Sequence, residues 1–543
     1  DKHGRACVDP AKGKQTNRYS LALVVQEWLG RKNAKANSGM VLRYHELDGV
    51  PMSAWPEHAI QYPKDDALNT LEAAQAMLCS AKNLESVSFQ SQAALCMHLG
   101  AINGWRTDAA RVSSLSALIA ENQGRLLEIA KAAGLLKENK RNVSGYSKNT
   151  KLIKALVTEK WGPLTPKTET GQVSMARETL EDSGHPALQA LGELSKWDKF
   201  AVYVPVLQQG VTTPVTVEGN PLLATGRASY EGLIQLMPRK GGIRECFIFR
   251  GVGCSTDYAA VELSSLSQVC IWTVGHSSLG DAISKGLDPH SLLGSQLTGS
   301  TYEEFLKRVK AKDVEALDLR QASKAANFGF PGGMGEATFV LAKRREGLHV
   351  CELFYRDGKC GEVQVTEWKK RQTAAPLCLR CLEQTRDLRN SWFTAWPEMR
   401  QYLNHISNLV EVSDVVETPV TKMLRGGMTY SRAANHMFQS LAAVGAKRAV
   451  IELTRMMYSD NNPLSGSRLC LFAHDETLID IPDRGVDAVD AAARLQADVM
   501  VKAMRGVIPD VKISAEPALM YRWSKDAKTV QDEKGRYVPW DSK

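Results

Sequence analysis

Three strand-like segments lie far apart in this chain, and a long stretch of helical pattern separates the last two. Runs of apolar residues mark FAVYVPVL at 200–207, IRECFIFR at 243–250 and RLCLFAHDETLIDI at 468–481. Between the second and third segments the apolar residues recur mainly at helical spacing. Strands separated in this way pair around a large helical insertion, so the order predicts an α+β fold with an antiparallel sheet.

The length of 543 residues exceeds one hydrophobic core, and about three or four domains are expected. Helical periodicity also occupies 18–30, 65–82 and 84–135, the last with a turn at GAINGWRTD. No apolar run reaches the roughly 18 residues of a membrane-spanning helix, so no membrane partner is expected. The start, DKHGRACVDP, has neither an initiator Met nor the apolar core of a signal peptide. A trimmed or processed chain from the cytoplasm is expected.

Basic residues outnumber acidic ones only slightly, 68 to 60, and the formal charge of +8 is a weak indication of a polyanionic partner. Local clustering is more informative. One short stretch with few acids contains Lys131, Lys137, Lys140, Arg141, Lys148, Lys151 and Lys154. This stretch either neutralises DNA phosphates, with Lys148 and Lys151 as candidate contacts, or forms an ordinary solvated helix face. Charge alone leaves both interpretations open.

Eleven cysteines without a paired framework are typical of a reducing compartment. Four of them, Cys351, Cys360, Cys378 and Cys381, contain one C-x-x-C pair and raise the question of a zinc site. However, LCLRCLEQTRDLRNSWF is predicted to be one helix, in which cysteines three positions apart often simply pack. Four-cysteine zinc sites usually show two close pairs. The packing interpretation is therefore favoured.

Acidic residues next to the second and third strand-like segments suit metal-ion chemistry. Asp257 lies in CSTDYAAVEL, and Asp475 and Glu476 are adjacent in LFAHDETLID. Mg²⁺ prefers hard oxygen ligands, and two such ions stabilise the negative charge that spreads during phosphoryl transfer. Pairing of the two strands would let Asp257 and Asp475 hold two Mg²⁺ ions, with Mn²⁺ as a substitute. Taken alone, an Asp-Glu pair near a strand end is more often a solvated turn.

The segment RQASKAANFGFPGGMG at 320–335 combines cations, an aromatic ring and glycines. Arg320, Lys324 and Phe328 are spaced by four and share one face of a helix. Two cations and a ring on one face suit a nucleoside triphosphate, because cations bind phosphates and the ring stacks on a base. The alternative is an amphipathic helix with exposed basic residues.

Together these segments resemble the motifs of family A DNA polymerases, the DNA polymerase I-like enzymes, especially those encoded by bacteriophages. DYAAVEL is similar to motif A, RQASKAANFG to motif B, and AHDE to motif C, in the family's order. ATGRASYEGLIQLMPRKGGIRECF, DPHS and NHMFQSLAA resemble further family segments, and GWRTD and PKTETGQVS resemble thumb segments. The resemblance extends from about residue 84 to the end.

This resemblance implies a template-directed DNA polymerase of replication or repair with a right-hand architecture, in which the palm is an antiparallel sheet and the fingers and thumb are helical. It implies a thumb at 84–205, a palm at 206–285 and 441–543, and fingers at 286–440. The implied partners are primer-template DNA and dNTPs, with replication accessory proteins as further partners. A monomer is expected, in the host cytoplasm if the protein is encoded by a phage.

The resemblance also implies roles for single residues. Asp257 and Asp475 would hold the metals, and Glu476 and His474 would support the primer end. Arg320, Lys324 and His290 would bind the nucleotide, and Lys324 would protonate the leaving pyrophosphate. Phe328 would pack on the sugar and base, and Glu262 would exclude a ribose 2′-OH. The minor-groove edge of the duplex would be contacted by Arg227, Gln235, Asn435 and Gln439.

Three positions depart from the family pattern. Gly332 stands where a tyrosine usually stacks near the templating base, which favours altered fidelity. Leu236 replaces an expected amide, and Ser264 replaces the arginine that usually ends motif A.

The N-terminal segment AIQYPKDDALNTLEAAQAM contains Tyr62 and Asp66 in a Y-x3-D pattern. This pattern is similar to the last motif of the RNase H-like 3′–5′ exonuclease that precedes the polymerase in this family. The other carboxylates of such an exonuclease have no counterpart in this sequence. Residues 1–83 are therefore predicted to be a partial exonuclease without proofreading activity.

Two other functions remain open. A single-subunit RNA polymerase-like nucleotidyltransferase shares the two aspartates and the motif B helix, but Glu262 argues against it because ribonucleotides need space at that position. A catalytically idle primer-template-binding protein is the second alternative. Asp257, Asp475, Arg320 and Lys324 argue against it, since a binding protein has no use for metal carboxylates.

Overall fold

The computed structural model shows two compact units, Asp1–Ser91 with Ser407–Ala433, and Gln92–Ile406 with Ala434–Lys543. It describes residues 8–9, 14–15, 20–31, 43–80, 84–139, 145–168, 171–217, 219–223, 225–230, 234–345, 349–354, 360, 365–370 and 373–541. None of the helices in these ranges combines the length and apolar character needed to cross a bilayer.

The smaller unit is built mainly from two helices that pack together, α1 (Leu21–Leu29) and α2 (Glu57–Ser80). Both helices were predicted, but α2 begins at Glu57, earlier than the predicted 65, and therefore contains Tyr62 as well as Asp66. The unit also contains the start of α3 (Leu84–Asn103) and the short strands β1 (Val8–Asp9), β2 (Lys14–Gln15), β11 (Val416–Glu417) and β12 (Leu424–Arg425).

The larger unit is organised around a mixed-length antiparallel sheet. Its central strand β8 (Phe247–Tyr258) pairs with β14 (Glu476–Ile481) and with β15 (Ala515–Arg522). β13 (Arg468–Ala473) pairs with β14, and β3 (Arg106–Thr107) joins the start of β8. The strand predicted at 243–250 begins only at Phe247 and continues to Tyr258, and its residues 252–256 pair with 477–481. The predicted pairing of strands across a long insertion is thus confirmed, with the contact further along the chain than the predicted segment.

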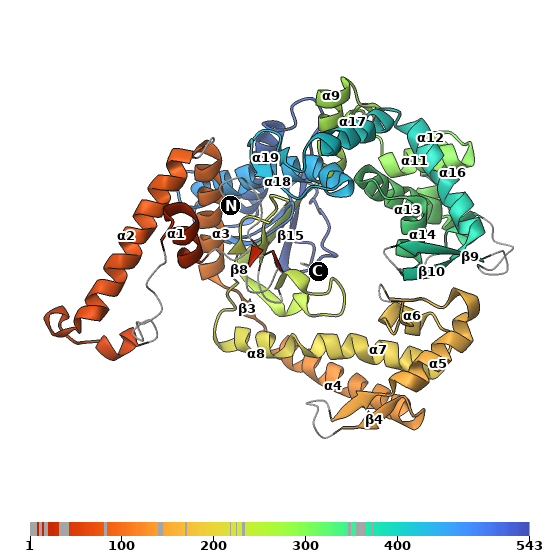
Figure 1. Cartoon of the computed structure of the whole chain (residues 1–543), viewed down its shortest axis with the longest axis horizontal. Coiled ribbons are helices and arrows are strands. Elements are labelled where there is room, and N and C mark those ends of the chain that lie inside the picture. Colours follow the sequence, from red (N-terminus) through yellow and green to blue (C-terminus); the bar gives the residue numbers. More distant parts are fainter. Residues whose placement is uncertain are drawn as a thin grey trace. The chain divides into compact units, whose positions relative to one another are not determined.

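Helix α19 (Val486–Arg505) packs against β8 and β15 (Figure 1). The buried amide of Gln496 donates to the Thr477 carbonyl at 3.1 Å, and the Tyr258 hydroxyl donates to the Met500 carbonyl at 2.7 Å. Thr477 and Tyr258 each adjoin one of the acidic residues of interest, so α19 holds the strand ends that carry them.

The insertion between β8 and β13 is mainly helical, as predicted. Its helices are α9 (Val261–Val274), α10 (Ser278–Ser284), α11 (Pro289–Thr298), α12 (Tyr302–Lys310), α13 (Val314–Gly329), α14 (Glu336–Arg345), α15 (Val350–Phe354), α16 (Leu379–Ala395), α17 (Glu398–Val412) and α18 (Tyr430–Met457). A hairpin of β9 (Val365–Lys370) and β10 (Thr373–Cys378), which was not predicted, lies with α14 and α16 (Figure 1). The predicted fingers range 286–440 is not one compact piece, because 407–433 groups with the smaller unit.

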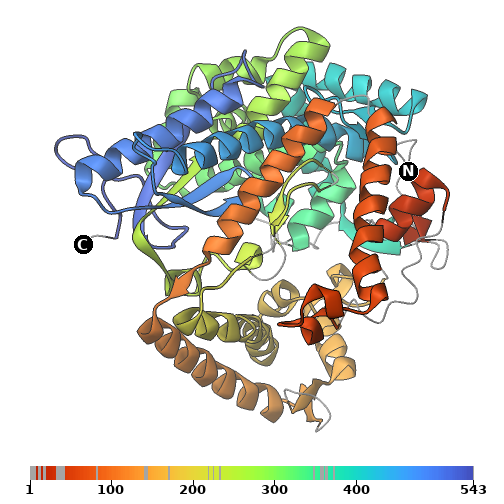
Figure 2. The same cartoon turned by 90° about the vertical axis from the view of Figure 1, so that its left-hand side faces the viewer.

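The region before β8 forms a helical group with its own hydrophobic core. It comprises α4 (Ala109–Ala132), α5 (Thr150–Trp161), α6 (Arg177–Glu181), α7 (Pro186–Ala201), α8 (Val204–Thr212) and the hairpin of β4 (Leu136–Glu138) with β5 (Tyr146–Lys148). α4 and α7 lie side by side (Figures 1 and 2). Leu126, Ile153, Leu188 and Leu191 are almost completely buried between these helices.

The prediction of a strand at 200–207 is wrong, because this segment ends α7 and begins α8. Its buried residues Phe200, Tyr203 and Leu207 recur at intervals of three and four, which is a helical pattern. Pro205 lies in the first turn of α8, where backbone N–H groups have no partner within the helix, so proline costs no hydrogen bond there. The alternating valines of the segment therefore do not reflect a strand.

The register between β8 and β14 is fixed by one carboxylate and one glycine. Asp480 of β14 accepts hydrogen bonds from the backbone N–H groups of Arg250 and Gly251, both at 3.0 Å. A Cβ atom at Gly251 would lie only 2.1 Å from the Ile481 carbonyl oxygen. The two strands therefore approach closely at a position that accepts no side chain.

We expect Gly251→Ala to lower the free energy of unfolding by about 1–3 kcal/mol, because the added methyl group forces the paired backbones apart. The control is Gly124→Ala in α4, where a Cβ would meet no atom within 4 Å. That change should stabilise the protein by about 0.5–1 kcal/mol through helix propensity. Urea unfolding of both variants tests the register, and equal effects would contradict it.

Candidate active site

The structure brings the acidic residues of the two strand ends together. Thr256 of β8 is paired with Thr477 of β14, so the next residues, Asp257 and Glu476, are neighbours across the sheet. Ala473 pairs with Glu476, which leaves His474 and Asp475 as a two-residue hairpin loop. His474 adopts a positive φ of 61°, as such tight loops require. The loop presents Asp475 at the same sheet edge as Asp257.

A lysine that no sequence motif indicated lies among these carboxylates. The Lys525 ammonium is 2.5 Å from Glu476 Oε2 and 3.7 Å from Asp257 Oδ2. Glu476 also accepts a hydrogen bond from the Ser255 hydroxyl. Carboxylate oxygens are the ligands that Mg²⁺ prefers, and the Lys525 ammonium is a cation at their convergence. The chemistry of these carboxylates therefore fits a divalent cation, for which Asp257 and Asp475 are candidate ligands.

Crowding raises the pKa of both aspartates. Loss of surrounding water, together with the negative charge of Asp475, raises the pKa of Asp257 to about 6. Burial likewise raises the pKa of Asp475. Nearby positive charge favours the ionised form of a carboxyl group. A bound divalent cation would therefore lower both pKa values, and protons compete with the cation for this site.

Glu262 and Arg227 lie beside the carboxylates. Glu262 is in the first turn of α9, directly after β8, and forms an ion pair with Arg227. A cavity of about 140 Å³ adjoins this pair. It is lined by Arg227, Val261, Glu262, Ala442, Ala443, His474 and Asp475. Burial lowers the pKa of His474, so its imidazole is neutral at pH 7.

The predicted shared face of the second motif is present on α13. Lys324 and Phe328 are exposed and Arg320 is partly exposed, whereas Ala322, Ser323 and Ala326 on other faces are buried. Phe328 is 40% exposed, which is unusual for a ring of this size. The helix therefore presents two cations and one ring outward.

Asp288 and His290 of the DPHS segment border this face. Asp288 caps α11 by accepting from the backbone N–H groups of His290 and Ser291, both at 3.2 Å. It also accepts from Arg320 Nε at 2.8 Å, which holds the guanidinium in place. The His290 ring lies 5.6 Å from the Phe328 ring, centroid to centroid. Three of the predicted nucleotide-binding residues, Arg320, His290 and Phe328, thus lie together with Asp288.

Asn327, which was not predicted to be important, sets the protonation of His290. Its Oδ1 accepts from the indole N–H groups of Trp392 and Trp396, both at 3.1 Å. Indoles only donate, so the remaining amide atom is the nitrogen, which also only donates. That nitrogen lies 3.0 Å from His290 Nδ1, so Nδ1 accepts and Nε2 carries the proton. Burial lowers the pKa of His290 to about 4, so the ring is a neutral donor.

Helix α18 carries the predicted duplex contacts Asn435 and Gln439, both partly exposed. A Cβ at Gly332, the first departure from the family pattern, would lie 2.5 Å from Asn435 Nδ2. Asn435 therefore fills the space beside Gly332. Further along α18, Ala442 and Ala443 line the cavity next to Asp475. One helix thus connects the end of α13 with the carboxylates.

The other departures have distinct environments. Leu236 is 67% exposed and donates no side-chain hydrogen bond, whereas its carbonyl accepts from the Tyr203 hydroxyl. Ser264 is completely buried, at a place where an arginine would need to find a partner. The backbone of Gln235 lies in a short 3-10 helix, Ile234–Leu236, and its side chain is outside the described part of the structure.

The remaining candidates lie elsewhere in the fold. Lys148 ends β5 and Lys151 lies in the first turn of α5, and both are exposed on the helical group before β8. Within the same basic stretch, Lys131 pairs with Glu128 and Lys154 donates to Gln172. Lys137 is exposed, and Lys140 and Arg141 fall outside the described residues. Tyr62 and Asp66 belong to the smaller unit.

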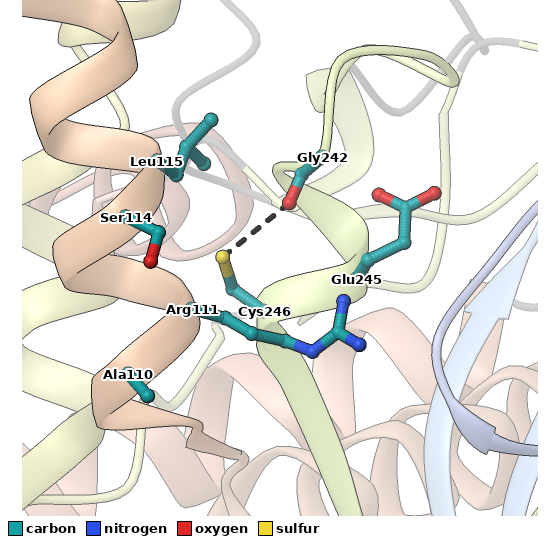
Figure 3. Close-up of a pocket in the computed structure, with 7 residues that line it drawn as sticks. All are labelled: Ala110, Arg111, Ser114, Leu115, Gly242, Glu245 and Cys246. Carbon is teal, nitrogen blue, oxygen red and sulfur yellow. Dashed lines mark hydrogen bonds between the residues drawn. The ribbon is translucent and has the colours of Figure 1, made fainter.

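A larger hollow, of about 490 Å³, lies between α4 and the loop before β8 (Figure 3). The Cys246 thiol donates to the Gly242 carbonyl at 3.3 Å at its edge. Its lining residues Arg111, Glu245 and Cys246 include none of the predicted site residues. The strand ends that carry Asp257, Asp475 and Glu476 therefore remain the candidate active site.

No protein-family profile and no curated protein sequence matches this chain. Its structure is similar to the solved structure of the POL domain of Pol1 from M. smegmatis, in complex with DNA primer-template and dNTP. The TM-score is 0.62 at 19% sequence identity, and the match covers 94% of this chain and 79% of that one. The chain has the fold of that polymerase domain. The predicted polymerase fold is confirmed, and the exonuclease-like piece at 1–83 stays a prediction.

We expect Asn327→Ala to lower the free energy of unfolding by about 2–4 kcal/mol, because two buried indole N–H groups lose their acceptor. Asn390→Ala, on the exposed face of α16, is the control and should change stability by no more than about 0.5 kcal/mol. Urea unfolding measures both. Similar values for the two variants would refute the proposed role of the amide.

The raised pKa of Asp257 predicts a pH-dependent stability in buffer without Mg²⁺. Between about pH 4 and pH 6 the folded protein binds more protons at this carboxyl than the unfolded chain, so stability falls as pH rises. Asp257→Asn removes this loss, and its melting temperature should exceed that of wild type above pH 6 but not at pH 4. Asp498→Asn, at an exposed position of α19, serves as the control. A melting temperature unchanged at pH 8 would contradict the prediction.

Proposed function

We propose that this protein is a template-directed DNA polymerase that adds dNTPs to a primer 3′ end by two-metal-ion phosphoryl transfer. The observation that carries the proposal is the edge of the antiparallel sheet, where Asp257, Asp475 and Glu476 converge. The proposal is supported by α13, which presents Arg320, Lys324 and Phe328, and by a fold shared with a polymerase domain that binds primer-template and dNTP.

In this proposal the primer 3′-OH attacks the α-phosphorus of the nucleotide, and the bond to the bridging oxygen of the leaving pyrophosphate breaks. Two Mg²⁺ ions, or Mn²⁺ in their place, would supply electrostatic stabilisation of the charge that develops. Asp257 and Asp475 would hold these ions, and Glu476 would support the primer-end site. Lys525 would leave Glu476 and Asp257 when the ions bind, since its ammonium lies at the same carboxylates.

The nucleotide would bind along α13. Arg320 is oriented by Asp288, and together with Lys324 it would neutralise the triphosphate. His290 would donate from Nε2 to a phosphate oxygen without changing its charge, because its ring is neutral. Lys324 would give a proton to the leaving pyrophosphate. Phe328 would cover the sugar and base, for which its exposed ring is suited.

Discrimination between sugars would depend on Glu262. Arg227 binds its carboxylate, which fixes the side chain beside the cavity next to Asp475. A side chain held in this way would occupy the space of a ribose 2′-OH. Arg227, Gln235, Asn435, Gln439 and His474 would contact the primer-template.

We further propose a thumb at 84–205, with Lys148 and Lys151 on DNA phosphates, a palm at 206–285 and 441–543, and fingers at 286–440. Residues 1–83, with Tyr62 and Asp66, would be the partial exonuclease. We also propose that the protein is a family A DNA polymerase encoded by a bacteriophage. It would act as a monomer in the host cytoplasm. Each of these proposals rests on the sequence resemblance.

The test is primer extension on a defined template with Mg²⁺, comparing deoxy- with ribonucleotides. Asp475→Ala should reduce dNTP extension by at least about 10³-fold, because metal ions contribute several kcal/mol to the transition state. The control Asp498→Ala, exposed on α19, should extend at the wild-type rate. Preferential use of ribonucleotides by wild type would instead support an RNA polymerase-like enzyme. Tight primer-template binding without extension would support an idle binding protein.

A further inference from the structure

Four cysteines from separate segments converge at one point beside the helices α13 and α16. Cys351 lies in α15, Cys360 in the connection that follows, and Cys378 and Cys381 at the junction of β10 and α16. Their four sulfur atoms all lie within 4.8 Å of one another. None of the other six described cysteines belongs to such a group.

The packing interpretation rested on the prediction that Cys378 and Cys381 both lie within one helix, and this prediction is wrong for Cys378. α16 begins at Leu379, so Cys378 ends the strand β10 and occupies the N-cap position, whereas Cys381 lies in the first turn. A C-x-x-C pair that spans a strand end and a helix start presents both sulfurs to one point. The second pair is formed by Cys351 and Cys360, whose wider spacing in sequence concealed it.

The distances suit one tetrahedral ion. Zn–S bonds of about 2.3 Å place sulfurs about 3.8 Å apart. Cys381 Sγ lies 3.3 Å from Cys351 Sγ and 3.6 Å from Cys360 Sγ. A disulfide joins only two sulfurs, so it would use one of these neighbours of Cys381 and leave the other without a bond. All four cysteines are free thiols in the structure.

We propose that Cys351, Cys360, Cys378 and Cys381 bind one structural Zn²⁺ ion. Three of the four side chains are at most 1% exposed, and a closed four-sulfur site without an open position is typical of structural rather than catalytic zinc. Four thiolates around Zn²⁺ carry a net charge of −2. Cys378 is the N-cap residue of the 17-residue helix α16, so the positive end of the helix dipole would offset part of this charge.

The ion would stabilise the position of α13, the helix proposed to bind the nucleotide. α13 packs against both α15 and α16, the two helices that the cysteines join. α16 also supplies Trp392, whose indole holds Asn327 of α13. Zinc would thus fix α15 and β10 to the start of α16, and α16 in turn holds α13. The site is distinct from the Mg²⁺ site, which uses carboxylates.

The proposal is tested by metal analysis of the full-length protein purified in reducing buffer, which requires no polymerase activity. One zinc ion per chain is expected. Cobalt exchanged into the protein should show the visible bands of tetrahedral coordination and the near-ultraviolet bands of thiolate ligation. Both measurements use wild type, so they do not depend on whether a cysteine variant folds.

The double variant Cys378→Ser/Cys381→Ser should lose the zinc, whereas Cys79→Ser, an exposed cysteine of the smaller unit, should keep one equivalent. Far-ultraviolet circular dichroism verifies that each variant is folded. Folded wild type without metal, with iron in place of zinc, or with these cysteines oxidised to disulfides would overturn the proposal. A folded double variant that retains the full zinc content would overturn it as well.

Discussion

The antiparallel pairing of β8 with β14 is the constraint on which the candidate site depends. These strands are separated by more than two hundred residues of sequence, yet their register decides whether Asp257 and Asp475 meet. A shift by one residue would turn one carboxylate to the opposite face of the sheet. Asp480 prevents that shift by binding two backbone N–H groups of β8, and Gly251 permits the close approach. A buried carboxylate at the far end of β14 thereby contributes to the position of Asp257 and Asp475.

This arrangement makes the ionised forms of the carboxyl groups at the strand ends less favourable. The pKa of Asp257 is raised to about 6 because the fold removes water from this carboxyl group and, second, because it places the negative charge of Asp475 nearby. Lys525 offsets part of that charge. Carboxyl groups with raised pKa values beside a lysine ammonium are a reason to regard the strand ends as a candidate functional site, because perturbed pKa values are common at such sites. Helix α18 lies next to both parts of the site, because it contacts Gly332 after the end of α13 and lines the cavity beside Asp475.

Local pattern predicted much of this protein. The strand β8, the strands β13 and β14, the helical insertion and the outward face of α13 follow from periodicity, which is a property of neighbouring residues, whereas β15 and β3 of the same sheet were not predicted. The segment at 200–207 misled because its valines alternate while its buried residues recur at helical spacing. Lys525 and Asn327 had no signal of their own, and Cys360 belonged to a set of four cysteines whose spacing favoured packing over zinc binding. Their roles arise from partners that are distant in sequence, namely carboxylates on two strands, two indoles on α16 and three other thiols. Such contacts exist only once the tertiary fold is formed.

Iron-mediated backbone cleavage decides whether residues of both strands hold the same divalent ions. Fe²⁺ bound in place of Mg²⁺, with ascorbate and peroxide, produces radicals that cut the chain next to the ion. If both strands hold the ions, we expect two cleavage sites, near Asp257 and near Asp475, that appear together and are suppressed together by excess Mg²⁺. Cleavage near only one of them, or at positions unrelated to either strand end, would contradict a shared metal site.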